Sequence, residues 1–293
     1  MRPRRSLALL AVLATTLALA ACGSNHAPTG QPDRTEVRTI SVEGSDREYR
    51  VHIPASLSRD PALVVMMHGG FGSAKQAEDA YGWDSLADSD GFVVAYPDGE
   101  GRSWNAGDCC GRGAREDVAD VAFITALVGD LQHEFAIDPS RTFATGMSNG
   151  ALMSYRLACD TTLFAAIAPV AGTIVTTCDH PAPTSILEIH GLDDGSVRMD
   201  GEPGGGVATV DGMPVQDVID LWRGVDGCGD PVITSADPVT TSISACPDGR
   251  TVELITIAGA GHQWPGSSAR DGADTPSTAL DATTTIWAFF EAA

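Results

Sequence analysis

One serine of the sequence lies in a context that can turn its hydroxyl into a nucleophile. Ser148 is the central residue of Gly146-Met147-Ser148-Asn149-Gly150, a G-x-S-x-G pattern. A strand-like stretch at 142–147 leads into it, and a helix-like stretch at 151–158 follows it. Glycines two residues to either side permit a strained strand-to-helix turn that exposes the hydroxyl. The pentapeptide alone is weak evidence in a glycine-rich chain, so the flanking strand and helix carry the prediction.

Two neighbouring aspartates follow the serine in the region where an assisting acid is expected. A serine hydroxyl is a poor nucleophile at neutral pH, so it needs a general base and an acid that orients the base. With a turn of this kind the groups follow one another in the order serine, acid, histidine. The strand-like stretch 185–190 leads into the turn 191–195, which contains Asp193 and Asp194. Their spacing does not separate the two.

One histidine lies beyond this turn. His262 belongs to the glycine-rich loop 258–266, which follows a strand-like stretch at 252–257. A loop of this kind can bring an imidazole to the serine, so His262 is the predicted base. His190 is the alternative, but no plausible strand-ending acid lies between Ser148 and His190.

Two backbone amides are candidates for stabilising an oxyanion. One is the amide of Asn149, directly after the serine, and the other is that of Gly70, in the loop after the apolar stretch 62–68. The loop reads Gly69-Gly70-Phe71-Gly72, and its missing side chains allow a close backbone approach.

Five motifs follow one another along the chain. They are His68-Gly69-Gly70-Phe71-Gly72-Ser73, Trp104-Asn105-Ala106-Gly107 with Cys109-Cys110, Gly146-Met147-Ser148-Asn149-Gly150, His190-Gly191 with Asp194, and Gly261-His262-Gln263-Trp264-Pro265-Gly266. Together they resemble the polyhydroxybutyrate depolymerase and feruloyl esterase family, and within it the LpqC-type secreted lipoprotein esterases of actinobacteria. The likeness spans residues 37–292 and implies an α/β-hydrolase fold with Ser148, Asp194 and His262 as the triad. It therefore favours Asp194 over Asp193.

The sequence departs from the family pattern at three places. Ala151 stands where the family often has a further glycine, Val197-Arg198-Met199 replaces V-P-Y, and Gly259-Ala260-Gly261 replaces a triple glycine. The triad is unaffected, but details of the pocket do not transfer.

The order of elements predicts one α/β domain over residues 37–293, with a mostly parallel sheet and helices on both faces. Residues 203–212 are irregular, and we expect either a lid or a surface insertion there. The strand-like stretches are 47–53, 62–68, 92–96, 142–147, 166–170, 185–190 and 252–257, and the amphipathic ones are 115–135, 214–224 and 278–291.

The N-terminal residues are typical of an export signal. A basic stretch at 1–5 precedes an apolar stretch at 7–21, and Leu19-Ala20-Ala21-Cys22 resembles a bacterial lipobox. We therefore expect a signal peptide over 1–21, lipidation of Cys22 and a flexible tether over 22–36. The membrane would then be reached only through the lipid, and ordinary cleavage with release of the enzyme is the alternative.

The cysteines indicate disulfides. Without Cys22 six remain, an even number in an exported chain. Proximity and strand-turn context favour Cys228 with Cys246 and Cys159 with Cys178, which leaves the adjacent Cys109 and Cys110. A zinc site is not expected, because the sequence has neither a C-x2-C pair nor H-E-x-x-H, and no other cofactor is expected.

The acidic composition argues against nucleic acid as a partner. The formal charge of −21 becomes −24 when Arg2, Arg4 and Arg5 leave with the signal (−21 minus 3). An acidic surface also disfavours polyanionic substrates.

Two tryptophans are candidates for substrate binding. Trp104 and Trp264 lie beside the predicted site and would either line a cleft or anchor the packing of turns. Asp117 and Asp120 are interpreted as charges on a helix face or in its first turn.

Together these features predict an exported carboxylic ester hydrolase that works through an acyl-enzyme. By resemblance, its substrates are feruloyl or acetyl esters of polysaccharides, or short polyhydroxyalkanoate esters. The alternatives are a serine peptidase of the same fold and a non-catalytic surface lipoprotein that binds glycans.

Overall fold

The computed structural model describes residues 32–205, 209–268 and 274–293. The predicted signal peptide, Cys22 and the tether up to residue 31 lie outside the described residues. Within the described part, no helix is long and apolar enough to cross a membrane. The chain divides into two units, Met1–Gly30 and Gln31–Ala293, and the second contains every element described below.

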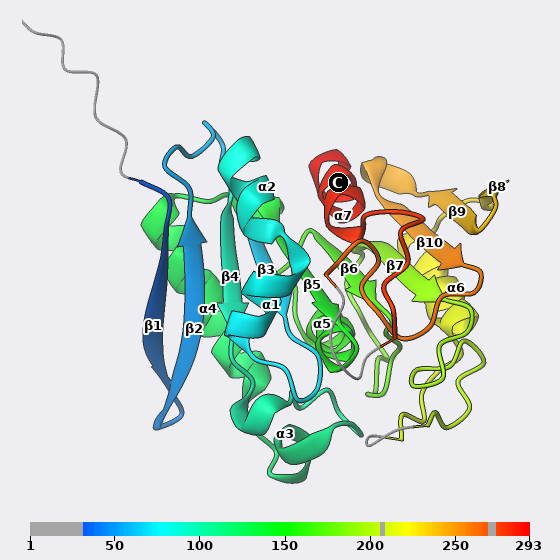
Figure 1. Ribbon diagram of the computed structural model, residues 1–293, viewed down its shortest axis with the longest axis horizontal. Helices are drawn as coiled ribbons and strands as arrows, with labels where there is room; N and C mark the ends of the chain where they lie inside the picture. The colour runs from blue at the N-terminus through cyan, green and yellow to red at the C-terminus, as the bar shows by residue number, and fades with distance from the viewer. Residues whose placement is uncertain (1–31, 206–208, 269–273) are drawn as a thin grey trace, which may run out of the picture. The chain divides into compact units, whose positions relative to one another are not determined.

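The second unit is built on one ten-stranded sheet with the order β1-β2-β4-β3-β5-β6-β7-β10-β9-β8 (Figure 1). Six neighbouring strands of this sheet are parallel, namely β4, β3, β5, β6, β7 and β10. Antiparallel strands extend the sheet at both edges, with β1 and β2 at one and β9 and β8 at the other. The strands are β1 (Arg34–Val42), β2 (Ser45–Ile53), β3 (Leu63–Met67), β4 (Val93–Pro97), β5 (Thr142–Met147), β6 (Ala166–Val170), β7 (Ser185–Gly191), β8 (Val232–Ala236), β9 (Val239–Ala245) and β10 (Thr251–Ile257).

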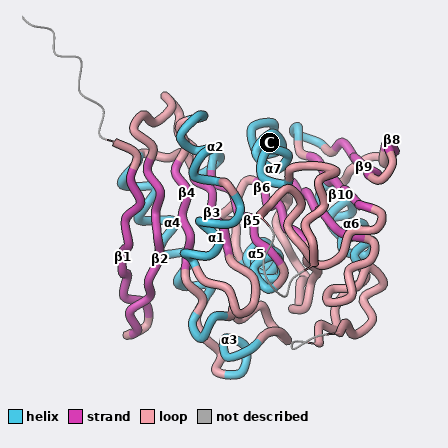
Figure 2. The backbone as a smooth tube through the Cα atoms, in the orientation of Figure 1, coloured by secondary structure: helices cyan, strands magenta, loops and turns pink. Residues whose placement is uncertain are grey.

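Helices cover both faces of the sheet, which confirms the predicted arrangement (Figure 2). Helices α1, α2 and α7 pack on one face, and α4, α5 and α6 pack on the other. Strand β3 is buried throughout and contributes alternate side chains to the two cores, as expected of a central parallel strand. The helices are α1 (Ala74–Tyr81), α2 (Trp83–Asp90), α3 (Gly111–Arg115), α4 (Asp120–Phe135), α5 (Asn149–Asp160), α6 (Val215–Asp226) and α7 (Ala282–Ala292).

The structure adds elements that the sequence did not indicate. Strand β1 begins at Arg34, inside the range expected for the tether, and pairs along its whole length with β2. Strands β8 and β9 form an antiparallel edge of the sheet, in which β8 is exposed throughout and β9 is mostly half-buried without alternation. Because hydrophobic alternation is the main sequence signal for a strand, edge strands without it are hard to predict from the sequence.

The helix expected over 115–135 is wrong at its N-terminal end. Helix α3 ends at Arg115, and α4 begins only at Asp120. Asp120 lies in the first turn of α4, which is one of the two positions expected for it, but it does not lie on the surface. It is buried and accepts hydrogen bonds from Arg47 Nη2 and from the Asn105 backbone N–H, both at 2.7 Å. These contacts fix the start of α4 against β2 and the loop after β4.

The structure contains three disulfides, Cys109–Cys110, Cys159–Cys178 and Cys228–Cys246, of which the last two join the pairs that the sequence favoured. The Cys159–Cys178 bond connects the end of α5 to the segment before β7. The Cys228–Cys246 bond connects the residue after Gly227, which caps α6, to the end of β9. These two bonds thus restrain the C-terminal ends of α5 and α6 and the edge of the sheet at β9.

We predict that removing the Cys228–Cys246 bond by the double change Cys228→Ser and Cys246→Ser lowers the free energy of unfolding by about 3 kcal/mol. The physical reason is that a crosslink closing a loop of this size reduces the entropy of the unfolded chain. Urea unfolding under non-reducing conditions measures the difference. The control is thiol titration of the unfolded parent lacking Cys22, which should reveal no free thiol. A double variant as stable as the parent would contradict the prediction.

Candidate active site

The turn around Ser148 joins β5 directly to α5. Ser148 has φ 55° and ψ −120°, a conformation that few residues other than glycine adopt. The flanking glycines leave no room for a side chain. A Cβ on Gly146 would lie 2.5 Å from the Gly150 backbone, and one on Gly150 would lie 2.2 Å from the carbonyl oxygen of Met67. Close packing of β3, β5 and α5 therefore requires the G-x-S-x-G spacing.

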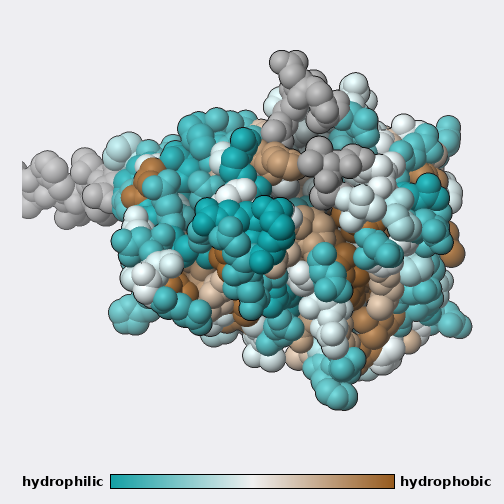
Figure 3. All heavy atoms as spheres, turned by 90° about the horizontal axis from the view of Figure 1, so that it is seen from below, coloured by the Kyte–Doolittle hydropathy of each residue, from teal (hydrophilic) through white to brown (hydrophobic). Residues whose placement is uncertain are grey.

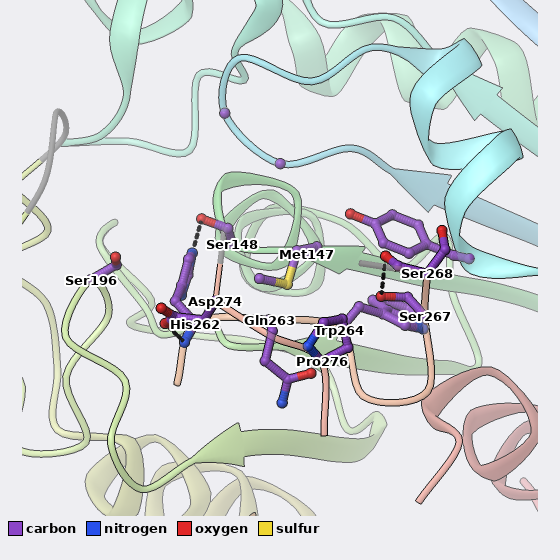
Figure 4. Close-up of a pocket in the computed structure, with 13 residues that line it drawn as sticks. Met147, Ser148, Ser196, His262, Gln263, Trp264, Ser267, Ser268, Asp274 and Pro276 are labelled. Atoms are coloured by element: carbon purple, nitrogen blue, oxygen red, sulfur yellow. Dashed lines mark hydrogen bonds between the residues drawn. The ribbon is translucent and has the colours of Figure 1, made fainter. Parts of the chain in front are cut away.

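Three of the predicted residues form a continuous series of hydrogen bonds. His262 Nε2 lies 2.8 Å from Ser148 Oγ (Figure 4). On the other side of the ring, His262 Nδ1 lies 2.7 Å from Asp194 Oδ2. An ionised carboxylate can only accept, so Nδ1 carries the proton and Nε2 accepts from the serine hydroxyl. The three residues come from the ends of β5, β7 and β10. These ends meet at one edge of the sheet, as expected for parallel strands.

The structure separates the two neighbouring aspartates. Asp193 is exposed, whereas Asp194 is buried. The other carboxylate oxygen of Asp194, Oδ1, accepts the backbone N–H groups of Ser196 and Val197, both at 2.8 Å. Asp194 is thus the acid in contact with His262. His190, the alternative base, contacts Glu188 and the Val197 carbonyl instead.

The surroundings of Asp194 keep it ionised. Burial alone would raise the pKa of its carboxyl group, but the hydrogen bond and charge of His262, the charge of His190 and the Val197 N–H hold the pKa below its usual range. Asp194 is therefore an acceptor that keeps the proton on His262 Nδ1.

The two candidate oxyanion residues lie next to each other. Gly69 and Gly70 line the same pocket as Ser148, and a Cβ placed on Gly70 would be 3.9 Å from Asn149 Cβ. Asn149 is the first residue of α5, where backbone N–H groups have no partner within the helix. The two candidate amides thus belong to residues that are neighbours in space beside Ser148.

Trp104 connects the glycine loop after β3 to the start of α5. Its backbone N–H donates to Asn149 Oδ1 at 2.7 Å, and Asn149 Nδ2 donates to the Trp104 carbonyl at 3.1 Å. Its indole N–H donates to the carbonyl of His68 at 2.8 Å. Trp104 is fully buried and is not among the pocket-lining residues. Its contacts are those of a packing anchor, one of the two roles considered for it.

His68 fixes the glycine loop from the other side. The Gly99 backbone N–H donates to His68 Nε2 at 2.9 Å, so Nδ1 carries the ring proton. Nδ1 in turn donates to the Gly69 carbonyl at 2.8 Å. The buried, neutral ring therefore couples the loop after β3 to the loop after β4. The H-G-G motif contains this residue, but its spacing alone does not reveal the contact.

A cavity of about 320 Å³ opens at Ser148 and His262. Trp264 contributes to its wall, with its ring stacked on Tyr81 at a centroid distance of 4.6 Å and its indole N–H bonded to Thr283 Oγ1. Viewed from the edge where the parallel strands end, the surface is mostly hydrophilic with an apolar band across it (Figure 3). Further lining side chains are those of Met147, Ser196, Gln263, Ser267, Ser268, Asp274 and Pro276.

Asp274 is a site residue that the sequence reasoning missed. Its Oδ2 accepts the backbone N–H of His262 at 2.6 Å, and a Cβ on Gly261 would lie 2.2 Å from that oxygen. The carboxylate thus holds the histidine loop and lines the pocket (Figure 4). Asp274 is twelve residues beyond His262 in a segment without a motif, so no sequence signal marks it.

The segment 203–212 packs in its described part against the turn after the acid. Gly205 N–H donates to the Gly195 carbonyl at 2.7 Å, and Gly204 N–H donates to the Val210 carbonyl at 3.1 Å. Residues 206–208 lie outside the described residues. Within the part of the chain that the structure describes, no group of three or more His, Cys, Asp or Glu side chains could hold a metal ion.

The sheet, the turn at the serine and the hydrogen-bonded series define an α/β-hydrolase. An acetyl xylan esterase from Aspergillus awamori has the same fold, with a TM-score of 0.61 at 17% identity over 88% of this chain and 100% of that one. At this identity the likeness concerns the fold alone.

Residues 48–216 match the model of the family described as esterase PHB depolymerase, and the chain belongs to this family. It is 30% identical to a Nocardia uniformis subsp. tsuyamanensis protein named as an esterase, NocK, over 80% of this chain and 75% of that protein. It is 29% identical to an Aspergillus flavus protein named as feruloyl esterase C, over 99% of both. It is 30% identical to feruloyl esterase B of Piromyces equi over 74% of this chain, which spans 42% of that protein's length. The protein is a carboxylic ester hydrolase.

We predict that Trp104→Phe destabilises the protein by about 1–3 kcal/mol more than Trp222→Phe. Both changes remove a fully buried indole, but only Trp104 donates to a buried carbonyl, which would be left unpaired. Trp222 Nε1 has no partner among the described residues, so Trp222→Phe is the matched control. Urea unfolding of the two variants measures the difference. Equal losses would mean that the bond to His68 does not hold the loops.

Proposed function

We propose that the protein is an exported serine esterase in which Ser148 is the nucleophile, His262 the general base and Asp194 the acid that orients it. The observation that carries this proposal is the unbroken series of hydrogen bonds from Ser148 Oγ through the imidazole to the buried Asp194, at the opening of the pocket. These groups have the roles and contacts that ester cleavage through an acyl-enzyme requires.

In the first half of the proposed reaction, Ser148 Oγ attacks the ester carbonyl carbon and its proton passes to His262 Nε2. The resulting imidazolium is stabilised by the ionised Asp194. The negative oxygen of the tetrahedral intermediate accepts hydrogen bonds from the backbone N–H groups of Gly70 and Asn149. The carbon–oxygen bond to the alcohol then breaks, and His262 returns the proton to the departing alkoxide.

In the second half, water replaces the alcohol. His262 Nε2 takes a proton from the water, whose oxygen attacks the acyl carbon, and the same amides stabilise the second intermediate. Collapse of this intermediate releases the carboxylic acid and returns the proton to Ser148 Oγ. No group beyond the protein and water is needed for the balance of atoms and charge.

The pocket supports esters with an uncharged acyl group. Its wall combines the apolar Met147 and Trp264 with hydroxyl and amide groups, and Asp274 is the one acidic side chain among the described lining residues. An acyl group with its own carboxylate would meet this negative charge. Feruloyl and acetyl esters of polysaccharides and neutral hydroxyalkanoate esters fit this chemistry, and the names of the relatives favour feruloyl esters.

The proposed location is outside the cell. Three disulfides among the described residues suit an oxidising compartment. The N-terminal pattern adds a lipid on Cys22 as the proposed membrane contact, with cleavage and release as the alternative. Nucleic acid is not a proposed partner of a chain with a formal charge of −21.

We predict that Ser148→Ala lowers ester hydrolysis by about 10⁶-fold, because the serine and histidine act as one unit. The substrates are p-nitrophenyl acetate, butyrate and hydroxybutyrate, together with methyl ferulate and an amide of ferulic acid. Ser89→Ala, on the exposed end of α2, is the matched control and should hydrolyse esters like the parent. Faster cleavage of the amide than of the ester would favour a peptidase. No turnover of any substrate by the parent would favour the glycan-binding alternative.

We also predict that kcat/KM falls as the pH drops below neutrality. Protonation of His262 removes the lone pair that accepts the serine proton, while Asp194 stays ionised because its pKa lies below the usual range. Therefore kcat/KM is expected to decrease, not increase, as the pH is lowered. Initial rates with a neutral ester, whose own ionisation does not change, measure the profile. A rate that stays constant down to pH 4 would contradict the assignment of the base.

A further inference from the structure

Strand β7 carries two buried polar side chains, Glu188 and His190, close to Asp194. Glu188 and His190 are two residues apart, so they project from the same face of the strand. Neither has more than 1% of its surface exposed. The reaction proposed above uses neither of them. Buried ionisable groups are costly unless they are paired, so the pair needs an explanation.

The carboxylate of Glu188 is surrounded by donors. Oε2 accepts from the Tyr155 hydroxyl of α5 at 2.9 Å. Oε1 accepts from the Gly172 backbone N–H at 3.0 Å and faces His190 Nδ1 at 2.8 Å. Burial raises the pKa of the Glu188 carboxyl group above its usual range, and the hydrogen bonds from His190, Gly172 and Tyr155 act against that rise by favouring the ionised form.

The contacts of His190 require protons on both ring nitrogens when Glu188 is ionised. Nε2 lies 2.8 Å from the carbonyl oxygen of Val197, which can only accept, so Nε2 carries a proton. Nδ1 faces the Glu188 carboxylate and donates to it. Burial alone would lower the pKa of His190, but the hydrogen bond and charge of Glu188 and the charge of Asp194 raise it.

The imidazole also reaches the acid and its loop. His190 Nε2 lies 3.7 Å from Asp194 Oδ2, the oxygen that contacts His262. Its partner Val197 donates its own N–H to the other oxygen of Asp194. One ring therefore contacts the loop that shapes Asp194 and places a charge beside it. The titratable groups that face the pair are Tyr155 from α5, Asp194 and, across Asp194, His262.

We propose that Glu188 and His190 form a buried ion pair that positions Asp194 and supplies a fixed positive charge behind it. Both are positioning residues, since neither lines the pocket or touches the reacting atoms. The inference rests on the proposed role of Asp194 as the orienting acid. The pair holds the Asp194 loop through the hydrogen bond from His190 to the Val197 carbonyl. The positive charge of His190 also offsets the negative charge of Asp194, which by itself would favour protonation of His262.

The charge state of His190 is the first test, and it needs no turnover. In the folded protein labelled with ¹⁵N-histidine, NMR at pH 7 should show one buried imidazole with both nitrogens protonated. Of the seven histidines, the signal is assigned to His190 by its disappearance in His190→Gln. If that variant does not fold, Glu188→Gln serves instead, because a neutral amide should convert the imidazolium to a neutral ring. A parent spectrum with only neutral buried imidazoles would overturn the proposal.

The pH profile of ester hydrolysis is the second test. Glu188→Gln keeps the shape of the side chain and removes the ion pair, so the cation beside Asp194 disappears. We expect the acidic limb of kcat/KM to move to higher pH by roughly half to one unit, as for loss of a partly compensated charge within ~4–6 Å. We expect kcat to fall with KM little changed. An unmoved limb in a folded variant would overturn the proposal.

A control separates this effect from general destabilisation. Asp226 is another buried carboxylate, bonded to Arg250 at 2.6 Å, and it lies outside the pocket. Asp226→Asn should lower stability and leave the acidic limb in place. Failure of the serine assignment would appear as an active Ser148→Ala, whereas failure of the ion pair would appear as a neutral His190 or an unmoved limb. The two outcomes are therefore distinguishable.

Discussion

The close contact between three backbone segments at the turn after β5 is the constraint on which the site depends. A Cβ on Gly150 would lie 2.2 Å from the carbonyl oxygen of Met67, and one on Gly146 would lie 2.5 Å from the Gly150 backbone, so no other residue fits at either position. The turn between them holds Ser148 in a strained conformation. Such strain persists only when the surrounding structure determines it, and the buried strands on either side of β5 do so. The position of the serine is thus a property of the sheet.

Around this turn, buried polar groups form hydrogen bonds with one another. Asn149 and Trp104 exchange two hydrogen bonds, Asp120 accepts from Arg47 and from the loop after Trp104, and the His68 ring joins two loops. In a medium of low dielectric constant, such networks are rigid, because breaking any bond leaves a buried group unpaired. The loop after β3 and the start of α5 are therefore held in place in the absence of a ligand, as the proposed oxyanion site would require.

The sequence was informative where function depends on local pattern. Ser148 and His262 stand in glycine-rich motifs that restrict the backbone, and the central strands are apolar throughout, so the fold and these residues could be predicted. The distinction between Asp193 and Asp194 depends on burial, which the loop acquires only from neighbours distant in sequence. Asp274 and the two edge strands have no local signature, because a carboxylate in a loop and exposed strands resemble ordinary surface. Family resemblance supplied what spacing alone left open at Asp194.

The contacts of His262 with Ser148 and Asp194 span 114 and 68 residues of sequence. Each contact closes a long loop and depends on a different strand end, so none can form until the sheet has been assembled from β5 to β10. A partly folded chain would then have a hydrophobic core without this series of hydrogen bonds. The proposed site therefore exists only when β10, the last parallel strand along the chain, has joined the sheet.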